Sequence, residues 1–553
     1  MNRNIIHTLW MTATLPLLLA SCQQEELPGM NGASDTTPLS ITVTDGGYAL
    51  TTSADGSQKA ATRATEDGYR TEFTASDACG LYLVRNGAIV YDNVKLTATA
   101  GTNGSLIWQP EAGVTLAGGM AGEHYFLYYP YRANMTDKVT ASATSDEEFF
   151  APLISGWQPA ADQSTYAAYT ASDLMTATGT AVRTNGSISL SFSMTHRMAM
   201  AVIEMPKTVY KFNDNSIPDY VIATTADFGD NAKPCRMADG TYRYIVNSAS
   251  GTATNITGSY DGDKKEFTIT PSGISANFCK TYKVDGATIS EKQTTLQMGD
   301  YFCKNSDDNW YIIPQEATPD GNVIGIVFYA GQHETDQSNY LQPLTEDGPT
   351  IPDGKVHGYV VALTDVHDDS SDRLRWEYGP GNVYNKAIDA STSTRDWQGY
   401  SNSLKFHEFV NKNENKEAGW EMKHFPAALA CETYGNRMLD KDGNDANGKY
   451  DWQKPLAAPG NTSGWFLPSY GQLQYLYKNR SVLSARMTEV KNSTPNNYSY
   501  KNHIKWVSTS LYYWSSTENS DYSDRAWYVY FYYGYGFGDS KRYAYCVRAV
   551  LAF

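Results

Sequence analysis

The chain has 553 residues, with 44 basic and 60 acidic side chains and a formal net charge of −16 at pH 7. This charge disfavours nucleic acid and anionic membrane surfaces as partners, because both require a basic face on the protein. Tyrosine is abundant, with 41 copies, and strand-forming residues alternate with turn formers, which is typical of a mainly β extracellular protein.

The N-terminus predicts a secretory signal peptide over residues 1–21, because Arg3 precedes an apolar run too short to span a bilayer as a helix. The sequence Leu19-Ala20-Ser21-Cys22 resembles the bacterial lipobox, and the following acidic pair resembles the surface-export signal of Bacteroidetes lipoproteins. This resemblance implies that Cys22 is lipidated and anchors the protein in the outer membrane at the cell surface. The alternative is a soluble secreted protein.

Residues 22–62 predict a linker that contains one strand, marked by the alternation from Leu39 to Val43. A first β domain is expected over residues 63–210. In it, Asn86-Gly87 separates two apolar runs and predicts a hairpin turn, and the run from Tyr125 predicts a strand that ends at Pro130.

A second β domain is expected over residues 211–365, and it closes with the strand from Val356 to Leu363. The polar, acidic stretch from Asp365 to Asp372 predicts a boundary. A third domain therefore spans residues 373–553, where tryptophan becomes frequent.

Cysteine usage permits disulfides outside the cytoplasm, but the pairing stays open. Cys279 with Cys303 is plausible on spacing. No cysteine stands in a C-x-x-C or metal-ligand cluster, so we expect no metal and no cofactor. The six cysteines after the lipobox are Cys79, Cys235, Cys279, Cys303, Cys431 and Cys546.

Two stretches of the first half carry a family resemblance. Asp173-Leu174-Met175 and the run from Phe192 to Ile203 resemble the fimbrillin-like (Mfa/FimA-type) lipoproteins of Bacteroidales, over roughly residues 40–365. The resemblance implies two β-sandwich domains of a pilus subunit. His196 lies in the second stretch, and we expect a packed strand histidine rather than a metal ligand, because no Cys, Asp or second His stands beside it.

The same resemblance implies assembly with other fimbrial subunits by donor-strand exchange. In that family a protease removes the N-terminal strand after a basic residue, and a strand of another subunit fills the groove and satisfies its open sheet edge. Arg63 stands where such a cut would fall, with Arg70 as a neighbouring candidate. The alternative is that Arg63 is a solvated linker residue.

The last domain shows helix signals between short strands. Residues 425–431 predict a short helix, and Gly464 to Leu476 predict a strand, an N-cap at Ser469 and an amphipathic helix. With the stretch from Tyr513 to Glu518 and the Val547-Arg548 ending, this order resembles the C-type-lectin-like fold, in the branch shared with the formylglycine-generating enzymes.

The predicted fold class is therefore mainly β, with two fimbrillin-like β-sandwich domains followed by an α+β C-type-lectin-like domain. In the lectin-like fold a disulfide often ties the first helix to the last strand, which implies a bridge between Cys431 and Cys546. The alternative is that Cys546 is a chance thiol.

Catalysis is not expected, because oxidative formylglycine chemistry needs a reactive cysteine pair and this domain has one cysteine on each side of its core. Calcium-dependent sugar binding would need a Glu-Pro-Asn or Gln-Pro-Asp loop, which is absent. The run from Asp440 to Asp445 looks calcium-like, but it lacks the spacing of an EF-hand, and a solvated turn is the alternative.

The tyrosines near the C-terminus predict a ligand-binding surface. Tyrosine offers large contact area with little side-chain entropy to lose, and Ser, Gly, Asn and Asp add adaptable hydrogen bonds, which is the composition of a paratope. The alternative is an aromatic-rich but merely packed sheet edge. The candidate ligand-binding residues are Tyr512, Tyr513, Asn519, Asp521, Tyr522, Asp524, Tyr528, Tyr530, Tyr532, Tyr533, Tyr535, Phe537, Asp539, Tyr543 and Tyr545.

These residue types can all be encoded by an Asn codon whose adenines are replaced. The pattern resembles the variable proteins of diversity-generating retroelements, in which a reverse transcriptase rewrites the 3′ end of a lectin-fold gene. Four intervening residues have the character of a constant scaffold: Trp527, Val529, Phe531 and Gly534.

The predicted function is a fimbrial tip adhesin that binds a host, bacterial or phage ligand, glycan or protein, through this surface. The final strand, Val547 to Phe553, is expected to close the last domain, which leaves no strand to donate and fits the tip of a pilus. One alternative is a surface lipoprotein that binds ligand but never polymerises. Another is an enzyme of the formylglycine or glycan-processing kind.

Overall fold

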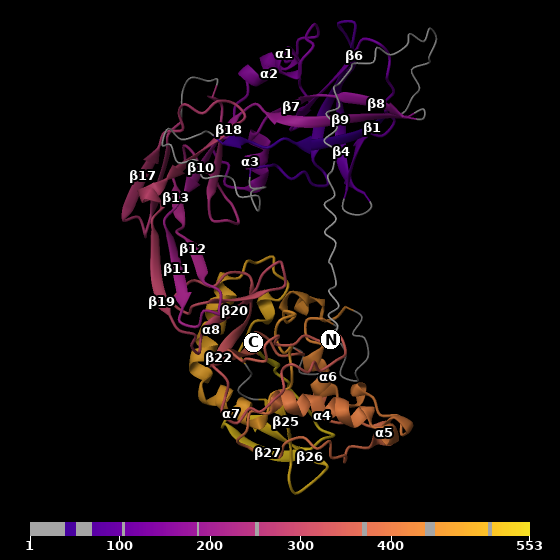
Figure 1. Ribbon diagram of the computed structural model, residues 1–553, viewed down its shortest axis with the longest axis vertical. Coiled ribbons are helices and arrows are strands. Elements are labelled where there is room, and N and C mark those ends of the chain that lie inside the picture. The colour runs from indigo at the N-terminus through magenta and orange to yellow at the C-terminus, as the bar shows by residue number, and fades with distance from the viewer. Residues whose placement is uncertain are drawn as a thin grey trace, which may run out of the picture. The chain divides into compact units, whose positions relative to one another are not determined.

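The computed structural model describes residues 39–50, 69–101, 105–184, 187–248, 254–367, 373–436, 448–506 and 511–553. The predicted signal peptide, Cys22, Arg63 and the run from Asp440 to Asp445 lie outside these residues. The described chain is mainly β, as predicted. It divides into two units, shown in Figure 1: unit 1 draws on residues 1–206 and 223–288, and unit 2 on residues 207–222 and 289–553.

The central strands of the first sheet of unit 1 are buried on both faces. Along one strand, Leu81 and Leu83 enter one apolar core while Tyr82 and Val84 enter another, as the two-residue period of a strand requires. The sheet follows the order β1 (Leu39–Asp45), β9 (Ser187–His196), β7 (Met175–Thr178), β6 (Glu123–Tyr129), β3 (Ala78–Arg85), β4 (Ala88–Ala100) and β5 (Leu106–Pro110), with β8 (Thr180–Thr184) also paired to β9.

Three short helices supply part of the apolar side chains that cover the Tyr82 face. Phe149 and Phe150 place their rings 5.1 and 5.8 Å from that of Tyr82. The predicted hairpin at Asn86-Gly87 is confirmed, with φ of 51° and 76° between β3 and β4. The helices are α1 (Asp146–Phe149), α2 (Ala151–Ser155) and α3 (Tyr166–Ser172).

A second set of strands completes unit 1. Met200 and Val202 of its central strand join the core that the first sheet supplies, while Ala201 and Ile203 face a further core. The five-stranded sheet has the order β14 (Cys235–Arg236), β15 (Tyr242–Val246), β10 (Ala199–Glu204), β18 (Phe278–Lys283) and β2 (Ala49–Leu50). The three-stranded sheet has the order β13 (Ala226–Phe228), β16 (Ile256–Tyr260) and β17 (Lys265–Ile269).

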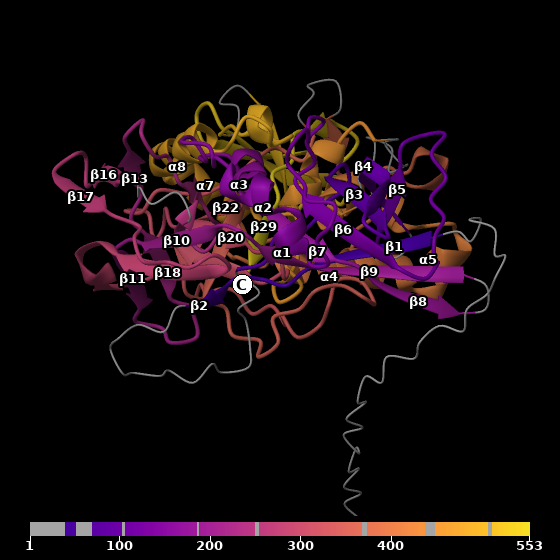
Figure 2. The ribbon, with the colours of Figure 1, turned by 90° about the horizontal axis from the view of Figure 1, so that it is seen from above.

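The N-terminal segment takes part in both of these sheets. β1 runs parallel to β9, and four residues later β2 runs parallel to β18. Figure 2 shows β1 beside β9 and β2 close to β18. The strand predicted from the alternation of Leu39 to Val43 is therefore confirmed.

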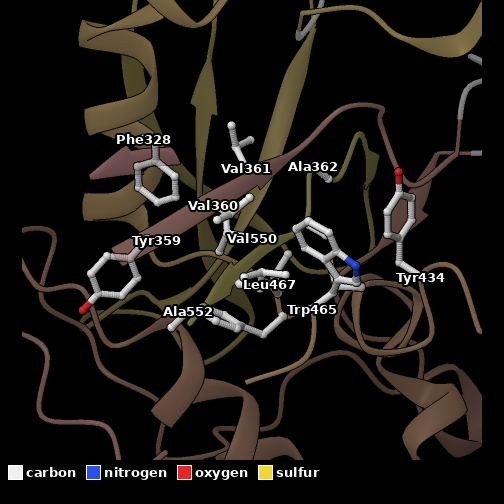
Figure 3. Close-up of a cluster of buried hydrophobic side chains, with 14 of the residues drawn as sticks. Phe328, Tyr359, Val360, Val361, Ala362, Tyr434, Trp465, Leu467, Val550 and Ala552 are labelled. Carbon is white, nitrogen blue, oxygen red and sulfur yellow. The ribbon is translucent and has the colours of Figure 1, made fainter. Parts of the chain in front are cut away.

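Unit 2 is built on a five-stranded antiparallel sheet. Figure 3 shows Val360 and Val361 of one strand next to Val550 of the last, with Trp465 packed edge-on against Tyr434. The order is β21 (Trp310–Ile313), β20 (Tyr301–Lys304), β22 (Val323–Ala330), β23 (Gly358–Ala362) and β29 (Val550–Ala552). A separate sheet has the order β12 (Tyr220–Ala223), β11 (Lys207–Phe212) and β19 (Ile289–Thr294).

Helices and two small sheets complete unit 2. The predicted N-cap is confirmed, since Ser469 accepts from the Gln472 amide and closes a capping box. The stretch from Gly464 to Leu467 is not a strand, because only Phe466 bridges to Val550. The helices are α4 (Gly399–Asn411), α5 (Asn413–Glu417), α6 (Pro426–Glu432), α7 (Tyr470–Lys478) and α8 (Arg480–Ser493). β24 (Leu374–Arg375) pairs with β28 (Ala544–Tyr545), and β25 (Tyr512–Glu518), β26 (Arg525–Tyr530) and β27 (Tyr535–Ser540) form the other sheet.

The division between units differs from the predicted domain boundaries. The predicted boundary after residue 365 falls inside unit 2, where β23 pairs with β29. Asp365 is not a solvated linker residue but a buried partner of Arg548, at 2.9 Å. An acidic residue in a polar stretch therefore marks a core ion pair here rather than an exposed connection.

None of the predicted disulfides is present in the described part of the chain, where no disulfide joins the six cysteines and all six are buried. Cys279 and Cys303 belong to different units. Cys431 lies in α6 and Cys546 follows β28, where burial raises the pKa of its thiol to about 12. These side chains act as small apolar core residues.

Candidate functional site

The predicted tyrosine-rich residues lie on the sheet of β25, β26 and β27 in unit 2. β26 pairs with β27 in unbroken antiparallel register from Arg525↔Ser540 to Tyr530↔Tyr535. Helices α4 and α7 contact this sheet, and the three strands lie at the lower edge of the unit in Figure 1. One face of the sheet is thus held by helices.

Side chains alternate across this sheet and separate an inward from an outward set. Tyr513 pairs with Val529, and both are buried. Tyr528 pairs with Phe537 on the opposite face, where Phe537 is 58 % exposed. We use the name aromatic surface for this outward set together with Tyr532 and Tyr533, which lie in the turn between β26 and β27, and Tyr545 of β28. Its members are Tyr512, Tyr528, Tyr530, Tyr532, Tyr533, Tyr535, Phe537 and Tyr545.

The rings of the aromatic surface form a row in which neighbouring rings contact one another. Tyr512 lies 5.1 Å from Tyr545 and 4.6 Å from Tyr530, measured between ring centroids. Tyr533 extends this row of rings, with its centroid 5.7 Å from that of Tyr530 and 6.0 Å from that of Tyr535. These contacts limit the rotation of each ring, so the surface is pre-organised for contact with a ligand.

Free hydroxyl groups accompany the most exposed rings. Tyr532, Tyr533 and Tyr535 are 57 to 64 % exposed, and none of their hydroxyls has a hydrogen-bond partner among the described residues. Tyr545 instead donates to Asp539, and burial together with Asp539 raises the pKa of its phenol. The exposed tyrosines can therefore both stack on a ligand and hydrogen-bond to it.

A buried charge cluster lies beneath this sheet. Lys541 is fully buried, and its Nζ lies 2.6 Å from Glu518 and 3.5 Å from Glu377. The same nitrogen lies 4.2 Å from the ring of Trp376. Burial raises the pKa of Glu377 to about 7, against the attraction of Lys541. The cluster fixes the chain between β27 and β28 to the body of the unit.

A second buried cluster corrects one of the site predictions. Tyr513 does not face a ligand, because its side chain is buried and its hydroxyl donates to Asp365 at 3.1 Å. Arg548 donates from Nε to the same carboxylate at 3.0 Å and from Nη1 to the Ala362 carbonyl at 2.9 Å. Tyr513 is therefore a core residue that joins β25 to the end of β23.

The positions predicted as a constant scaffold have packing roles. Val529 and Phe531 are buried, and Trp527 is half-buried against Tyr470 at 5.2 Å. Gly534 has a φ of 75°, and a Cβ there would lie 2.0 Å from the ring of Tyr477. Both the backbone angle and the close ring exclude larger residues at Gly534.

The remaining site predictions fall into two groups. Seven of the predicted residues are exposed: Asp521, Tyr522, Tyr532, Tyr533, Tyr535, Phe537 and Tyr543. Seven others are half-buried: Tyr512, Asn519, Asp524, Tyr528, Tyr530, Asp539 and Tyr545.

Three neighbours were not predicted. Arg525 lies over the ring of Tyr522 at 4.6 Å, and Arg542 lies between Tyr543 at 5.1 Å and Tyr384 at 5.8 Å. The two arginines stand close to tyrosines in the sequence and could have been found there. Tyr384 is distant in sequence and gave no such signal.

Two kinds of feature are absent from the described part of the chain. None of its helices is long and apolar enough to cross a membrane. Groups of three or more His, Cys, Asp or Glu side chains that could hold a metal ion are also absent from these residues.

Comparison with known proteins identifies relatives of this chain. Residues 62–302 match the family model described as fimbrillin-like. A protein of Bacteroides ovatus described as "putative fimbrium tip subunit Fim1C" is 27% identical over 549 residues, which are 93% of each chain. The crystal structure of a fimbrial protein from Bacteroides ovatus covers 94% of this chain and 99% of its own, with 24% identity and a TM-score of 0.41.

Proposed function

We propose that the protein is a cell-surface fimbrial adhesin that sits at the fimbrium tip and binds a glycan or protein ligand through the aromatic surface. One observation carries the proposal: contacting tyrosine rings are exposed, with free hydroxyls, on a sheet that buried ion pairs hold in place. Exposed rings of this kind supply binding area at low entropic cost.

The tip position rests on two supports. The relative from Bacteroides ovatus carries the description of a fimbrium tip subunit. In addition, β29 is buried in unit 2, pairs with β23 and is bridged by Phe466 on its other side. A strand with both neighbours in place is not available to another subunit. Lipidation at Cys22, cleavage at Arg63 and entry of another subunit's strand in place of the N-terminal strand belong to the same proposal.

The proposal includes a C-type-lectin-like arrangement of the C-terminal part of unit 2 and diversification of the aromatic surface by a retroelement. The outward residues are all reachable from an Asn codon, while residues such as Val529 and Phe531 are buried, and this separation of variable from packed positions supports diversification. Exposed substitutions away from the packed layer cost little stability. A retroelement could therefore replace the codons of the outward residues without unfolding the domain.

Ligand binding is tested with beads that carry the full chain. The beads are added to a glycan array and to panels of epithelial and bacterial cells, and the bound beads are counted on each target. The triple variant Tyr532→Ser, Tyr533→Ser, Tyr535→Ser should bind at least about tenfold fewer targets, because three exposed rings are lost. The matched control is Tyr166→Ser, which removes a tyrosine that is 49 % exposed in unit 1. Equal binding by the triple variant and the wild type would contradict the proposal.

Assembly is tested by immunogold labelling and by the ladder of fimbriae on gels run without full denaturation. We expect label at fimbrium tips and loss of incorporation in Arg63→Ala. Label spread over the cell surface, with no incorporation in either protein, would favour the alternative of a binding lipoprotein that does not polymerise.

A further inference from the structure

The N-terminal strand β1 occupies an edge of the first sheet of unit 1. It pairs with β9 alone, in parallel register from Leu39↔Ile188 to Asp45↔Met194. Val43 is buried and Ile41 half-buried against the core that this sheet encloses, while Thr42 and Thr44 are exposed. Removal of β1 would therefore open both an apolar slot and a row of backbone groups on β9.

A buried charge cluster stands at the end of this edge. His196, the last residue of β9, is fully buried between two carboxylates. Its Nδ1 lies 2.9 Å from Asp173, and its Nε2 lies 2.9 Å from Asp45, the last residue of β1. Asp45 and Asp173 have side chains that are only 3 % and 1 % exposed. The pair with Asp45 exists only while β1 is in place, and without β1 the buried cation keeps Asp173 alone.

Tyr48 extends the same cluster. Its ring stacks on the His196 ring at 3.8 Å, and its hydroxyl donates to Asp173 at 2.7 Å. The backbone between Asp45 and Tyr48 is fixed as well, because Gly46 donates to the Met194 carbonyl and Gly47 donates to the Asp45 carboxylate. The segment thus presents its acidic and aromatic side chains at a set spacing of three residues.

The burial of His196 explains why a carboxylate is needed at the position of Asp45. Without Asp45, the imidazole of His196 would be enclosed by an apolar strand and would lose the carboxylate that lies 2.9 Å from its Nε2, and a buried charge that loses an ion-pair partner is strongly destabilised. The two carboxylates outweigh the effect of burial on His196 and raise its pKa to about 9. His196 is therefore a cation at neutral pH, which makes an unpaired Nε2 costlier still.

We propose that the edge of β9 selects its incoming strand by charge as well as by apolar pattern. The partner is a strand of another fimbrial subunit with a carboxylate that reaches His196 from the position paired with Met194. It also has apolar residues two and four positions before this carboxylate and an aromatic residue three positions after it. This inference rests on the strand exchange in the proposed function. It adds the rule by which one strand is accepted and another rejected.

The test uses the full chain cut after Arg63 by an arginine-specific protease, with release of the N-terminal segment followed by mass spectrometry. Fluorescent peptides that copy residues 39–50 are added, and their binding is measured by anisotropy at pH 7. The Asp45→Asn peptide should bind at least tenfold more weakly than the wild-type peptide. The matched control is the Thr42→Asn peptide, which changes an exposed residue of the same strand and should bind within about twofold of the wild type.

Each outcome bears on a different step. Tenfold discrimination against Asp45→Asn, with Thr42→Asn unaffected, supports the charge rule. Equal binding of the wild-type and Asp45→Asn peptides overturns the charge rule and leaves strand exchange standing. Binding of none of the peptides contradicts strand exchange itself and, with it, this inference.

Discussion

The aromatic surface and the buried charge clusters of the protein use side chains in opposite ways. On the aromatic surface, Tyr533 and Tyr535 present exposed rings and free hydroxyls. In the clusters, Arg548 and Lys541 are fully buried and every neighbouring carboxylate is part of an ion pair. The difference separates an exposed layer of unit 2, which we propose for recognition, from a buried layer that stabilises the unit. A change in one layer should leave the property of the other layer intact.

The largest expected effect comes from breaking a buried pair. Arg548→Met leaves the Asp365 carboxylate buried without its cation, and loss of one partner of a buried pair costs about 3–5 kcal/mol. We expect the free energy of unfolding of unit 2 to fall by that amount in chemical denaturation of the full chain. The control is Arg542→Met, which removes an exposed arginine. This variant should change the free energy of unfolding by less than about 0.5 kcal/mol. A small effect of Arg548→Met would show that the cluster does not hold the sheet.

A smaller effect is expected at the turn between β26 and β27. Gly534→Ala strains a backbone with φ of 75° and places a methyl group against the ring of Tyr477. We expect a loss of about 1–3 kcal/mol in the same unfolding experiment. Gly331→Ala is the matched control, since Gly331 has a φ of 81° and no atom within 4 Å of the new Cβ. If both variants lose the same amount, the contact with Tyr477 contributes nothing.

The cluster around His196 should respond to pH. The groups that face His196 are Asp45, Asp173 and Tyr48, and burial raises the pKa of the Tyr48 phenol far enough to keep it protonated. Because the pKa of His196 is raised from 6.5 to about 9, its contribution is complete below pH 6.5 and is lost as the pH rises through 9.

The measurement is the rate at which the N-terminal segment leaves the chain cut after Arg63. We expect release at pH 10 to be about tenfold faster than at pH 7, which corresponds to about 1.4 kcal/mol. The His196→Gln chain has no imidazole to deprotonate, so its release rate should not show this acceleration between pH 7 and pH 10. An equal acceleration in both chains would place the pH response elsewhere.

The smallest effect on stability is expected on the aromatic surface itself. The triple variant Tyr532→Ser, Tyr533→Ser, Tyr535→Ser removes rings that are all more than half exposed. The free energy of unfolding should change by less than about 0.5 kcal/mol per substitution. A loss of several kcal/mol would mean that these rings pack the domain and that the two layers are not separate.

Local sequence signals predicted much of the fold. The cap at Ser469, the hairpin at Asn86-Gly87 and the strand β1 follow from rules that involve only neighbouring residues. The division of the C-terminal residues into inward Val529 and Phe531 and outward tyrosines was also visible, because strand residues alternate with a period of two.

Long-range pairing could not be predicted in the same way. Tyr513 resembles its outward neighbours, and only its pairing with Val529 and its hydrogen bond to Asp365 show that it is a core residue. Asp365 stands in a polar stretch, and its partner Arg548 is 183 residues away. His196 is enclosed by Asp45, which is distant along the chain. Burial of a charged residue depends on partners that its local sequence does not contain.

The most direct test of the two-layer account is deep sequencing of the 3′ end of the gene, and of the DNA that follows it, in a population of cells. The account predicts substitutions at codons for outward residues such as Tyr532 and Tyr535, a near-copy template repeat, and constant codons for the scaffold residues Trp527, Val529, Phe531 and Gly534. Substitutions spread equally over outward and inward codons, or an invariant 3′ end without a repeat, would contradict it.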